Sequence, residues 1–429
     1  MSAKPYAGRM PLPQPVEGNH PGGARRRKAL GQWFTPPALV EHVVDLAVSG
    51  AQSPIRTVLD PACGDGRFLA AIARRLGPSV RLIGVDIDEH AVAAARSNVP
   101  SADIRHDDSL ALDWADEQFD LVIGNPPFLN QLATATTRGG RSRFGGGAYA
   151  NSAAEFLALA TLLAHDDGGR VALVLPQSVL TTRDAGPIRA DVQTKAAIVH
   201  AWWSQTAVFD AAVHTCVLVL ETGHDHGPVT RTYGRGFVIR EPVNPGDAWG
   251  RLLIEAPSPL SGAPRWDGPV LGDIAEFTAD FRDQYYGLIG AVGDELDGPP
   301  LITSGLIDPG ICRWGERPVR FAKRAFVAPR VALDRLSPKL QRWASQRLVP
   351  KILIANQTRL IEAVIDRHGA WLPSVPVITC TTQQLDRVWQ VLSSPAATAW
   401  AHEQAAGSGL SPTSVRLTAS LLAGIPLQD

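Results

Sequence analysis

The chain has 429 residues, of which 45% are hydrophobic and 19% charged, and its formal net charge at pH 7 is −1. At roughly 100–200 residues per domain, this length predicts two or three domains and excludes a peptide hormone or a disulfide miniature, while the apolar content excludes global disorder. The four cysteines form no CxxC pair and no CxxC…HxxxH spacing, which argues against a zinc module and a disulfide framework and favours a reducing, cytoplasmic location.

Charge is distributed unevenly along the chain. Residues 1–30 hold six Lys or Arg and one Glu, a net +5, and residues 311–367 hold thirteen Lys or Arg and four Asp or Glu, a net +9. The remainder therefore carries −15, which predicts an acidic body with a basic working face, although basic residues also commonly solvate helices. Residues 1–30 lack the apolar core of a signal peptide, and we expect them to form a flexible basic arm with no membrane association.

From Gly31 to about Glu221, apolar runs alternate with helical patterns, which is typical of a parallel α/β sheet. The patterns predict helices over 67–75, 90–97 and 153–164, and strands over 57–60, 80–85, 119–123, 170–175, 197–204 and 215–220. Residues 132–150, rich in Gly and Ser, are expected to form a mobile loop. We predict a first domain over 31–245 and a second over 246–429, with strands at 350–354 and 371–379 and helices at 382–392 and 411–423.

The strongest motif starts at Val58 and reads VLDPACGDGRFLAAIARR. A strand ending in Asp60 is followed by a turn containing Gly64 and Gly66 and then by a helix, an arrangement that allows a ligand to approach the backbone closely. Asp86 ends the next strand, where a ribose diol would lie. The loop is neither GxGxxG nor a Walker loop, and Asp60 would repel a pyrophosphate, so we predict that the ligand is S-adenosylmethionine, which carries an amino group and a sulfonium.

The second motif, Gly124-Asn125-Pro126-Pro127-Phe128, follows the strand predicted at 119–123. Two prolines cannot donate hydrogen bonds and hold an extended turn, so carbonyls of this segment are available as acceptors. The Asn125 side-chain oxygen and the Pro126 carbonyl can grip the two N–H groups of a conjugated amine, with Phe128 stacked on the planar substrate. Positioning then supplies most of the rate, and no strong base is needed. The alternative is an ordinary turn that ends a strand.

On these motifs, the first domain resembles the gamma-class N6-adenine DNA methyltransferases over about residues 30–222. Gly31-Gln32-Trp33-Phe34-Thr35-Pro36 matches the segment that precedes the Gly loop in that class. The resemblance implies a doubly wound, mostly parallel class I methyltransferase sheet and a C-terminal mixed α+β target-recognition domain. The catalytic residues it implies are Asn125, Pro126, Pro127 and Phe128, and Phe209 would pack against the extruded base. The cofactor contacts it implies are Thr35 and Pro36 for the methionine end, Asp60 for the amino group, Ala62 and Gly64 beside Gly66 for close backbone contact, Asp86 for the ribose, and Asp108, with Asp107 as the alternative, for the adenine amino group.

The second domain supplies the basic surface that an enzyme acting on duplex DNA requires. Arg320, Lys323 and Arg324 are the predicted contacts to DNA, and basic residues recur nearby at Arg317, Arg330, Arg335, Lys339, Arg342, Arg347 and Lys351. We expect double-stranded DNA as a partner, with a separately encoded restriction endonuclease as a further candidate, and no metal site. Amino-methyltransferases acting on RNA guanine or protein glutamine, and a non-catalytic DNA-specificity subunit, are the alternatives.

Overall fold

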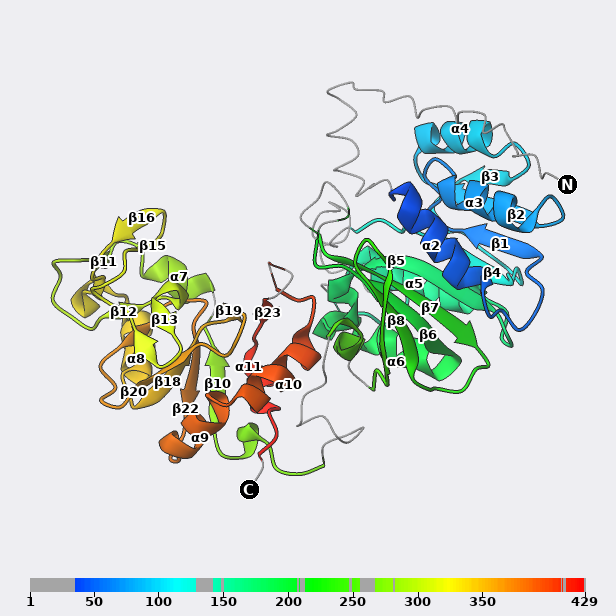
Figure 1. The fold of residues 1–429 in the computed structure, drawn as a ribbon. Helices are drawn as coiled ribbons and strands as arrows, with labels where there is room; N and C mark the ends of the chain where they lie inside the picture. The colour runs from blue at the N-terminus through cyan, green and yellow to red at the C-terminus, as the bar shows by residue number, and fades with distance from the viewer. Residues whose placement is uncertain are drawn as a thin grey trace, which may run out of the picture.

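The computed structural model describes residues 35–128, 142–147, 150–206, 208, 213–246, 249–254, 267–280, 282–409, 411 and 414–427. Its first part is built on a nine-stranded sheet with the strand order β3-β2-β1-β4-β5-β7-β6-β8-β9 (Figure 1). The strands are β1 (Thr57–Asp60), β2 (Arg81–Asp86), β3 (Asp103–His106), β4 (Leu121–Gly124), β5 (Arg170–Pro176), β6 (Ala196–Trp203), β7 (Thr215–Thr222), β8 (Val229–Tyr233) and β9 (Val238–Val243). The helices of this part are α2 (Pro37–Val48), α3 (Arg67–Leu76), α4 (Glu89–Asn98), α5 (Ser152–Leu163) and α6 (Gly186–Lys195).

Neighbouring strands from β3 to β5 run parallel, whereas β7 lies antiparallel between β5 and β6. Successive residues of β5 point to opposite faces, so Leu173 packs in a core with α5 and α6, and Val174 packs in a second core with α2, α3 and α4. Helices therefore cover both faces, which explains why the central strands are continuous apolar runs. The predicted doubly wound, mostly parallel α/β class is confirmed.

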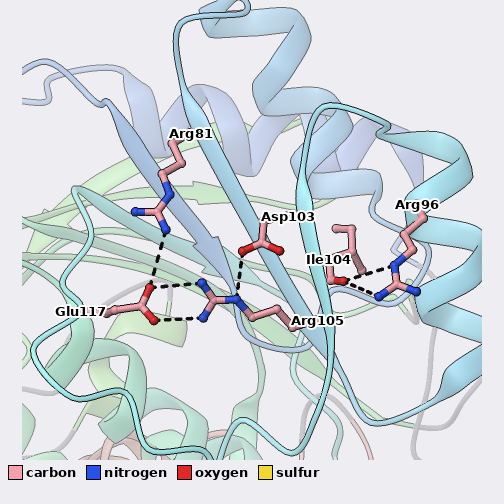
Figure 2. A network of polar contacts seen from close by, with 6 residues as sticks. All are labelled: Arg81, Arg96, Asp103, Ile104, Arg105 and Glu117. Atoms are coloured by element: carbon pink, nitrogen blue, oxygen red, sulfur yellow. Dashed lines mark hydrogen bonds and ion pairs between the residues drawn. The ribbon is translucent and has the colours of Figure 1, made fainter.

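The edge strand β3, which the sequence patterns did not predict, is held by charged side chains. Arg105 donates to Glu117 at 3.0 and 3.3 Å and to Asp103 at 3.0 Å, and Arg81 lies 4.0 Å from Glu117 (Figure 2). Arg96 of α4 donates to the Ile104 carbonyl at 2.8 Å. Because β3 buries only one of its four side chains, it carries no apolar run that would identify it.

The second part contains a four-stranded antiparallel sheet with the order β10-β22-β18-β20. These strands are β10 (Glu276–Ala279), β22 (Ile378–Thr381), β18 (Lys351–Ile354) and β20 (Ala363–Asp366). A short hairpin joins β15 (Val319–Phe321) to β16 (Arg324–Phe326), and the helices are α7 (Arg282–Gly287), α8 (Pro338–Arg347), α9 (Leu385–Leu392), α10 (Pro395–Ala405) and α11 (Ala419–Ala423). The expected mixed α+β content is confirmed.

Two predictions in this part were wrong. The single strand predicted over 371–379 is two strands, β21 (Leu372–Pro373) and β22, because prolines at 373 and 376 lack the N–H that a continuous ladder needs. The helix predicted over 411–423 is a two-residue strand, β23 (Val415–Arg416), followed by α11. The Gly-Ser loop predicted at 132–150 lies outside the described residues except at 142–147 and 150.

The two parts meet where α10 packs against the 3₁₀ helix η4 (Trp249–Leu253). Trp249 is fully buried in the core formed with α5 and α6, Thr181 Oγ1 donates to the Ala406 carbonyl at 3.0 Å, and Arg251 lies 3.7 Å from Glu403. A Cβ at Gly250 would lie 2.2 Å from the Glu403 carbonyl oxygen, so the two backbones touch directly. Across the described ranges, no helix is long and apolar enough to span a membrane.

Candidate active site

The predicted site residues of the first part gather at the carboxyl ends of β1 to β4. Asp60 is the last residue of β1, Asp86 is the last residue of β2, and Asn125 directly follows β4. Because these strands run parallel, their carboxyl ends share one edge of the sheet, where open α/β sheets bind ligands. The structure thus brings residues far apart in sequence to one site.

Asp60 is the most buried carboxylate of this edge, with 1% of its surface exposed. Its Oδ1 accepts a hydrogen bond from the Ala62 amide at 3.1 Å, whereas its buried Oδ2 has no hydrogen-bond partner in the described part of the chain. Burial raises the pKa of this carboxyl well above its ordinary value, and the carboxylates of Asp86 and Asp65 raise that pKa further. A buried acceptor of this kind is costly unless a ligand supplies a donor, and an α-ammonium group would do so.

Gly124 makes room for this carboxylate. A Cβ on Gly124 would lie 2.4 Å from Asp60 Oδ1, closer than real contacts allow. The glycine before Asn125 is therefore required by the packing of β4 against the end of β1. Neighbouring Cys63 is buried, burial raises the pKa of its thiol, and a Cβ on Gly84 would lie 3.0 Å from its sulfur, so Cys63 is packed as a small apolar residue.

The Gly loop is bonded to Asp86. Gly64 and Gly66 have φ values of 53° and 79°, which favour glycine, and the Gly64 amide donates to Asp86 Oδ2 at 2.8 Å. Asp86 Oδ1 accepts from the Asp88 amide at 2.9 Å, and burial raises the pKa of the Asp86 carboxyl. An ionised carboxylate has about four lone-pair positions, so a side chain fixed in this way still has capacity to accept from ligand hydroxyls.

Asp108 lies in a turn after β3 that is tied to the loop after β1. Its Oδ1 accepts from the Leu110 amide at 3.0 Å, and Ser109 Oγ donates to the Pro61 carbonyl at 2.6 Å. Asp108 is partly buried, whereas Asp107 is exposed. The Asp107 amide donates to the Asp86 carbonyl at 3.1 Å, so this turn is also joined to the end of β2.

The segment before α2 reaches the same edge. Thr35 is 2% exposed, and its Oγ1 accepts a hydrogen bond from Asn125 Nδ2 at 3.1 Å. The Thr35 carbonyl accepts from Arg67, which also forms a bidentate pair with Asp65 at 2.6 and 2.9 Å. Arg67 was not predicted as part of the site, although it opens the helix directly after the Gly loop. Pro36 caps α2, where its carbonyl accepts from the Leu39 and Val40 amides.

The Asn-Pro-Pro-Phe segment is extended beyond β4. Ser152 Oγ, at the start of α5, donates to the Pro127 carbonyl at 2.5 Å, a contact that sequence reasoning missed because Ser152 follows 25 residues later. Pro126 is buried, and Phe128 is partly buried and packs against both cores of the sheet. The predicted Phe209 lies outside the described residues.

A family model described as N-6 DNA Methylase matches residues 23–235, which include all of the site described above. Residues 23–235 therefore resemble the N-6 DNA methylase family. The Type II methyltransferase M.TthHB8I of Thermus thermophilus is 40% identical over 101 residues, which are 24% of this chain and 22% of that protein. The Type II methyltransferase M.CvrRI of Paramecium bursaria Chlorella virus XZ-6E is 31% identical over 160 residues, 37% of this chain and 39% of that protein.

This chain therefore spans less than two fifths of the length of these relatives. A Ribosomal protein L11 methyltransferase of Methylobacillus flagellatus is also similar, at 38% identity over 91 residues, which are 21% of this chain and 30% of that protein. Among solved structures, the Type IIL restriction-modification enzyme MmeI in complex with DNA has a TM-score of 0.56 and 14% identity, covering 94% of this chain and 69% of that one. This likeness shows a shared fold that extends over both parts of the chain.

Arg320, Lys323 and Arg324, predicted to contact DNA, lie in the second part and are all exposed on the β15–β16 hairpin. They are separate in sequence and in sheet from the edge that carries Asp60 and Asn125. Within the described ranges, no group of three or more His, Cys, Asp or Glu side chains could hold a metal ion.

Proposed function

We propose that this chain is a site-specific DNA methyltransferase that transfers a methyl group from S-adenosylmethionine to the exocyclic amino group of adenine in double-stranded DNA. We place it in a restriction-modification or phage-defence system, with a separately encoded endonuclease as partner and a cytoplasmic location. The observation that carries the proposal is the meeting of Asp60 and Asp86 with the Thr35–Asn125 pair at one edge of the sheet.

The residues at this edge fit S-adenosylmethionine. The α-ammonium group of the cofactor would give the buried Asp60 Oδ2 a donor, and Asp86 would accept from the ribose hydroxyls. Thr35 and Pro36 would hold the methionine end, and Ala62, Gly64 and Gly66 would let the cofactor approach their backbone. Asp108 would contact the adenine amino group of the cofactor. Bound in this way, the cofactor would supply a methyl group on a sulfonium, and the neutral thioether would be the leaving group.

At the substrate end, Asn125 positions the target amine. Its amide nitrogen donates to Thr35, so its oxygen is the atom of this side chain that can accept from the amine. Pro126 supplies the second acceptor, Phe128 supplies a face for stacking, and Ser152 acts through the Pro127 carbonyl to position the segment. An amine held between two acceptors gains nucleophilicity as it becomes tetrahedral, which is electrostatic stabilisation of the transition state.

Charge and fold support DNA as the substrate. The first part lies in the acidic portion of the chain, and residues 311–367 add a net +9 that can bind a polyanion. The fold shared with MmeI, an enzyme solved with DNA, covers 94% of this chain, so it includes the second part. A second candidate is methylation of a protein, which the similarity to a ribosomal protein L11 methyltransferase favours, and the glutamine amide is the protein acceptor weighed from the sequence. Methylation of RNA guanine and a non-catalytic role as a specificity subunit are the remaining candidates.

One assay separates these functions. The full chain is incubated with tritiated S-adenosylmethionine and, in parallel, with genomic DNA, total RNA and protein extract as acceptors. Label in DNA, with 6-methyladenine found by nucleoside mass spectrometry, supports the proposal. Finding 4-methylcytosine instead would assign a neighbouring amino-methylating activity, and label in RNA or protein alone would overturn the proposal. No transfer by a chain that still binds the cofactor would indicate a specificity subunit.

A further inference from the structure

The basic residues of 311–367 differ in whether a carboxylate neutralises them. Five of the thirteen Lys and Arg form ion pairs with carboxylates, namely Arg313, Arg317, Arg347, Lys351 and Arg367. The other eight form no ion pair with the described residues, namely Arg320, Lys323, Arg324, Arg330, Arg335, Lys339, Arg342 and Arg359. Three of these eight, Arg320, Lys323 and Arg324, lie on the single β15–β16 hairpin.

The β15–β16 hairpin has a turn of two residues, because Phe321 pairs with Arg324. The turn residues Ala322 and Lys323 have φ values of 47° and 67°, and positive φ at both positions is the type I′ geometry that usually requires Asn-Gly. A left-handed conformation costs a residue with a Cβ roughly 1–2 kcal/mol. The chain thus holds an alanine and an exposed lysine in a strained turn where glycine would be more stable, and such strain often accompanies function.

The surrounding contacts fix this turn. Phe321 and Phe326 are buried, the Tyr285 ring lies 4.8 Å from the Phe321 ring, and the Tyr285 hydroxyl accepts from the Ala322 amide at 3.0 Å. The hairpin therefore presents Arg320, Lys323 and Arg324 from a rigid base. In Figure 1 it lies at the end of the second part that is farthest from α9.

We propose that the β15–β16 hairpin lies in the major groove of duplex DNA and that Arg320, Lys323 and Arg324 contact base edges there, so that the hairpin determines the methylated sequence. The major groove admits a two-stranded ribbon, whereas the minor groove is about 6 Å wide, and Arg or Lys donating to guanine O6 and N7 is the commonest specific contact. Reading bases requires donors at fixed positions, which the rigid turn supplies. This inference rests on the proposed function for its choice of DNA.

The helix α8 offers a matched set of cations on an ordinary backbone. Lys339 and Arg342 are exposed and form no ion pair with the described residues, and Arg342 Nε donates to the Pro338 carbonyl of its own helix at 3.4 Å. Exposed cations on a regular helix are suited to contacting phosphates. Such contacts carry no sequence information. Replacing them removes charge without touching the hairpin.

To test this, the full chain is used to select bound duplexes from a randomised DNA library, and the base preference at each position of the selected DNA is measured. The variants are Arg320→Gln, Arg324→Gln and Lys323→Gly, and Lys339→Gln/Arg342→Gln is the control. We expect each hairpin variant to lower the preference at one or two positions by roughly 10- to 100-fold. The control should weaken binding to all sequences equally and reduce the slope of log affinity against log salt by about 1 for each cation removed.

Lys323→Gly distinguishes a loss of base contact from a loss of folding. Glycine suits the positive φ at this position, so this variant should melt no lower than the wild type. Hairpin variants that select the wild-type sequence with uniformly weaker binding would assign these cations to phosphates and overturn the proposal. A wild-type chain that selects no sequence would overturn it as well. A chain that selects a sequence through the hairpin but transfers no methyl group would leave this inference intact and refute the proposed reaction.

Discussion

Thr35 Oγ1 accepts a hydrogen bond from Asn125 Nδ2, and the two residues are ninety positions apart in the chain. Thr35 thereby orients the amide that we propose to be catalytic, and it lies where the cofactor is expected. We predict that Asn125→Ala binds S-adenosylmethionine normally while turnover falls roughly 10²-fold or more, the scale for loss of one preorganised polar contact.

Thr35→Val, which keeps the shape and removes the acceptor, should lower turnover less than Asn125→Ala does. Thr35→Ser keeps the hydroxyl and serves as the control. Single-turnover kinetics and calorimetric binding of the cofactor measure the two effects separately. Near-normal turnover of Asn125→Ala would mean that this segment is only a turn.

Asp60 and Asp86 give a test of the cofactor site. Asp86→Ala should weaken S-adenosylmethionine binding by about 1.5–3 kcal/mol, because it removes charge-assisted hydrogen bonds. Asp60→Asn should also weaken binding, yet the free protein should melt at the same or a higher temperature, because burial already disfavours the Asp60 charge. Calorimetry and thermal melting measure both effects, with Asp116→Asn, an exposed carboxylate outside the site, as the control. Equally tight binding of a nicotinamide dinucleotide would contradict this cofactor assignment.

Phe128 separates stacking from packing. Phe128→Ala should cost about 1–3 kcal/mol in binding a substrate base. It should also lower the melting temperature, because Phe128 packs against both cores of the sheet. Phe128→Tyr keeps the ring and should remain active, so kinetics of both variants on one DNA duplex give the comparison. A Tyr variant as inactive as the Ala variant would contradict a stacking role.

His42 makes stability depend on pH. Its ring stacks on Phe237 at 3.9 Å and lies 3.0 Å from Thr232 Oγ1, and burial lowers its pKa to about 4 from the ordinary 6.5. Between pH 6.5 and pH 4, His42 is therefore mostly protonated in the unfolded chain and mostly neutral in the folded chain. The free energy of unfolding consequently decreases as pH falls from 6.5 toward 4. His42→Gln should lose less stability than the wild type between pH 7 and pH 5, measured by urea unfolding. Identical losses would contradict the prediction.

The second part contains a buried ion pair between Lys351 and Asp366 at 2.6 Å, with side chains 0% and 3% exposed. Asp366 also accepts from the Ala370 and Trp371 amides, so it holds the turn after β20. Lys351→Met leaves this carboxylate without its cation and should lower the free energy of unfolding by about 3–5 kcal/mol. The exposed pair of Arg367 and Asp386 is the matched control, and Arg367→Met should change the free energy of unfolding far less than Lys351→Met does, as measured by urea unfolding.

Much of the first part was predictable because its elements carry regular signals. β1 matches its predicted bounds, 57–60, and α3 and β5 extend one residue beyond theirs, since a strand buried on both faces reads as an unbroken apolar run. The motifs also placed Asp60, Asp86 and Asn125 at the ends of strands, and parallel pairing was enough to bring them together.

The rest depended on contacts that no local pattern contains. β3 buries only Ile104 and is otherwise held by its pairing with β2 and by the Arg105–Glu117 pair, so no apolar run identifies it. The packing of α10 on η4 joins distant segments of the chain, and no local pattern shows it. The contacts of Ser152 with Pro127 and of Arg67 with Thr35 join segments 25 and 32 residues apart. The sequence also contains thirteen basic residues in 311–367 but does not show which of them are paired with carboxylates.

The close approach of the two backbones at Gly250 restricts which second parts could be exchanged between relatives. A Cβ at Gly407 would lie 2.4 Å from the Cβ of Gln177, so a second glycine in this interface also leaves no space for a side chain. The angle between the two parts therefore depends on two missing methyl groups. A second part carried over from a relative with alanine at either position would pack at a different angle to the nine-stranded sheet. If the second part selects the DNA sequence, the spacing between the selected bases and the base bound at Asn125 would then change as well.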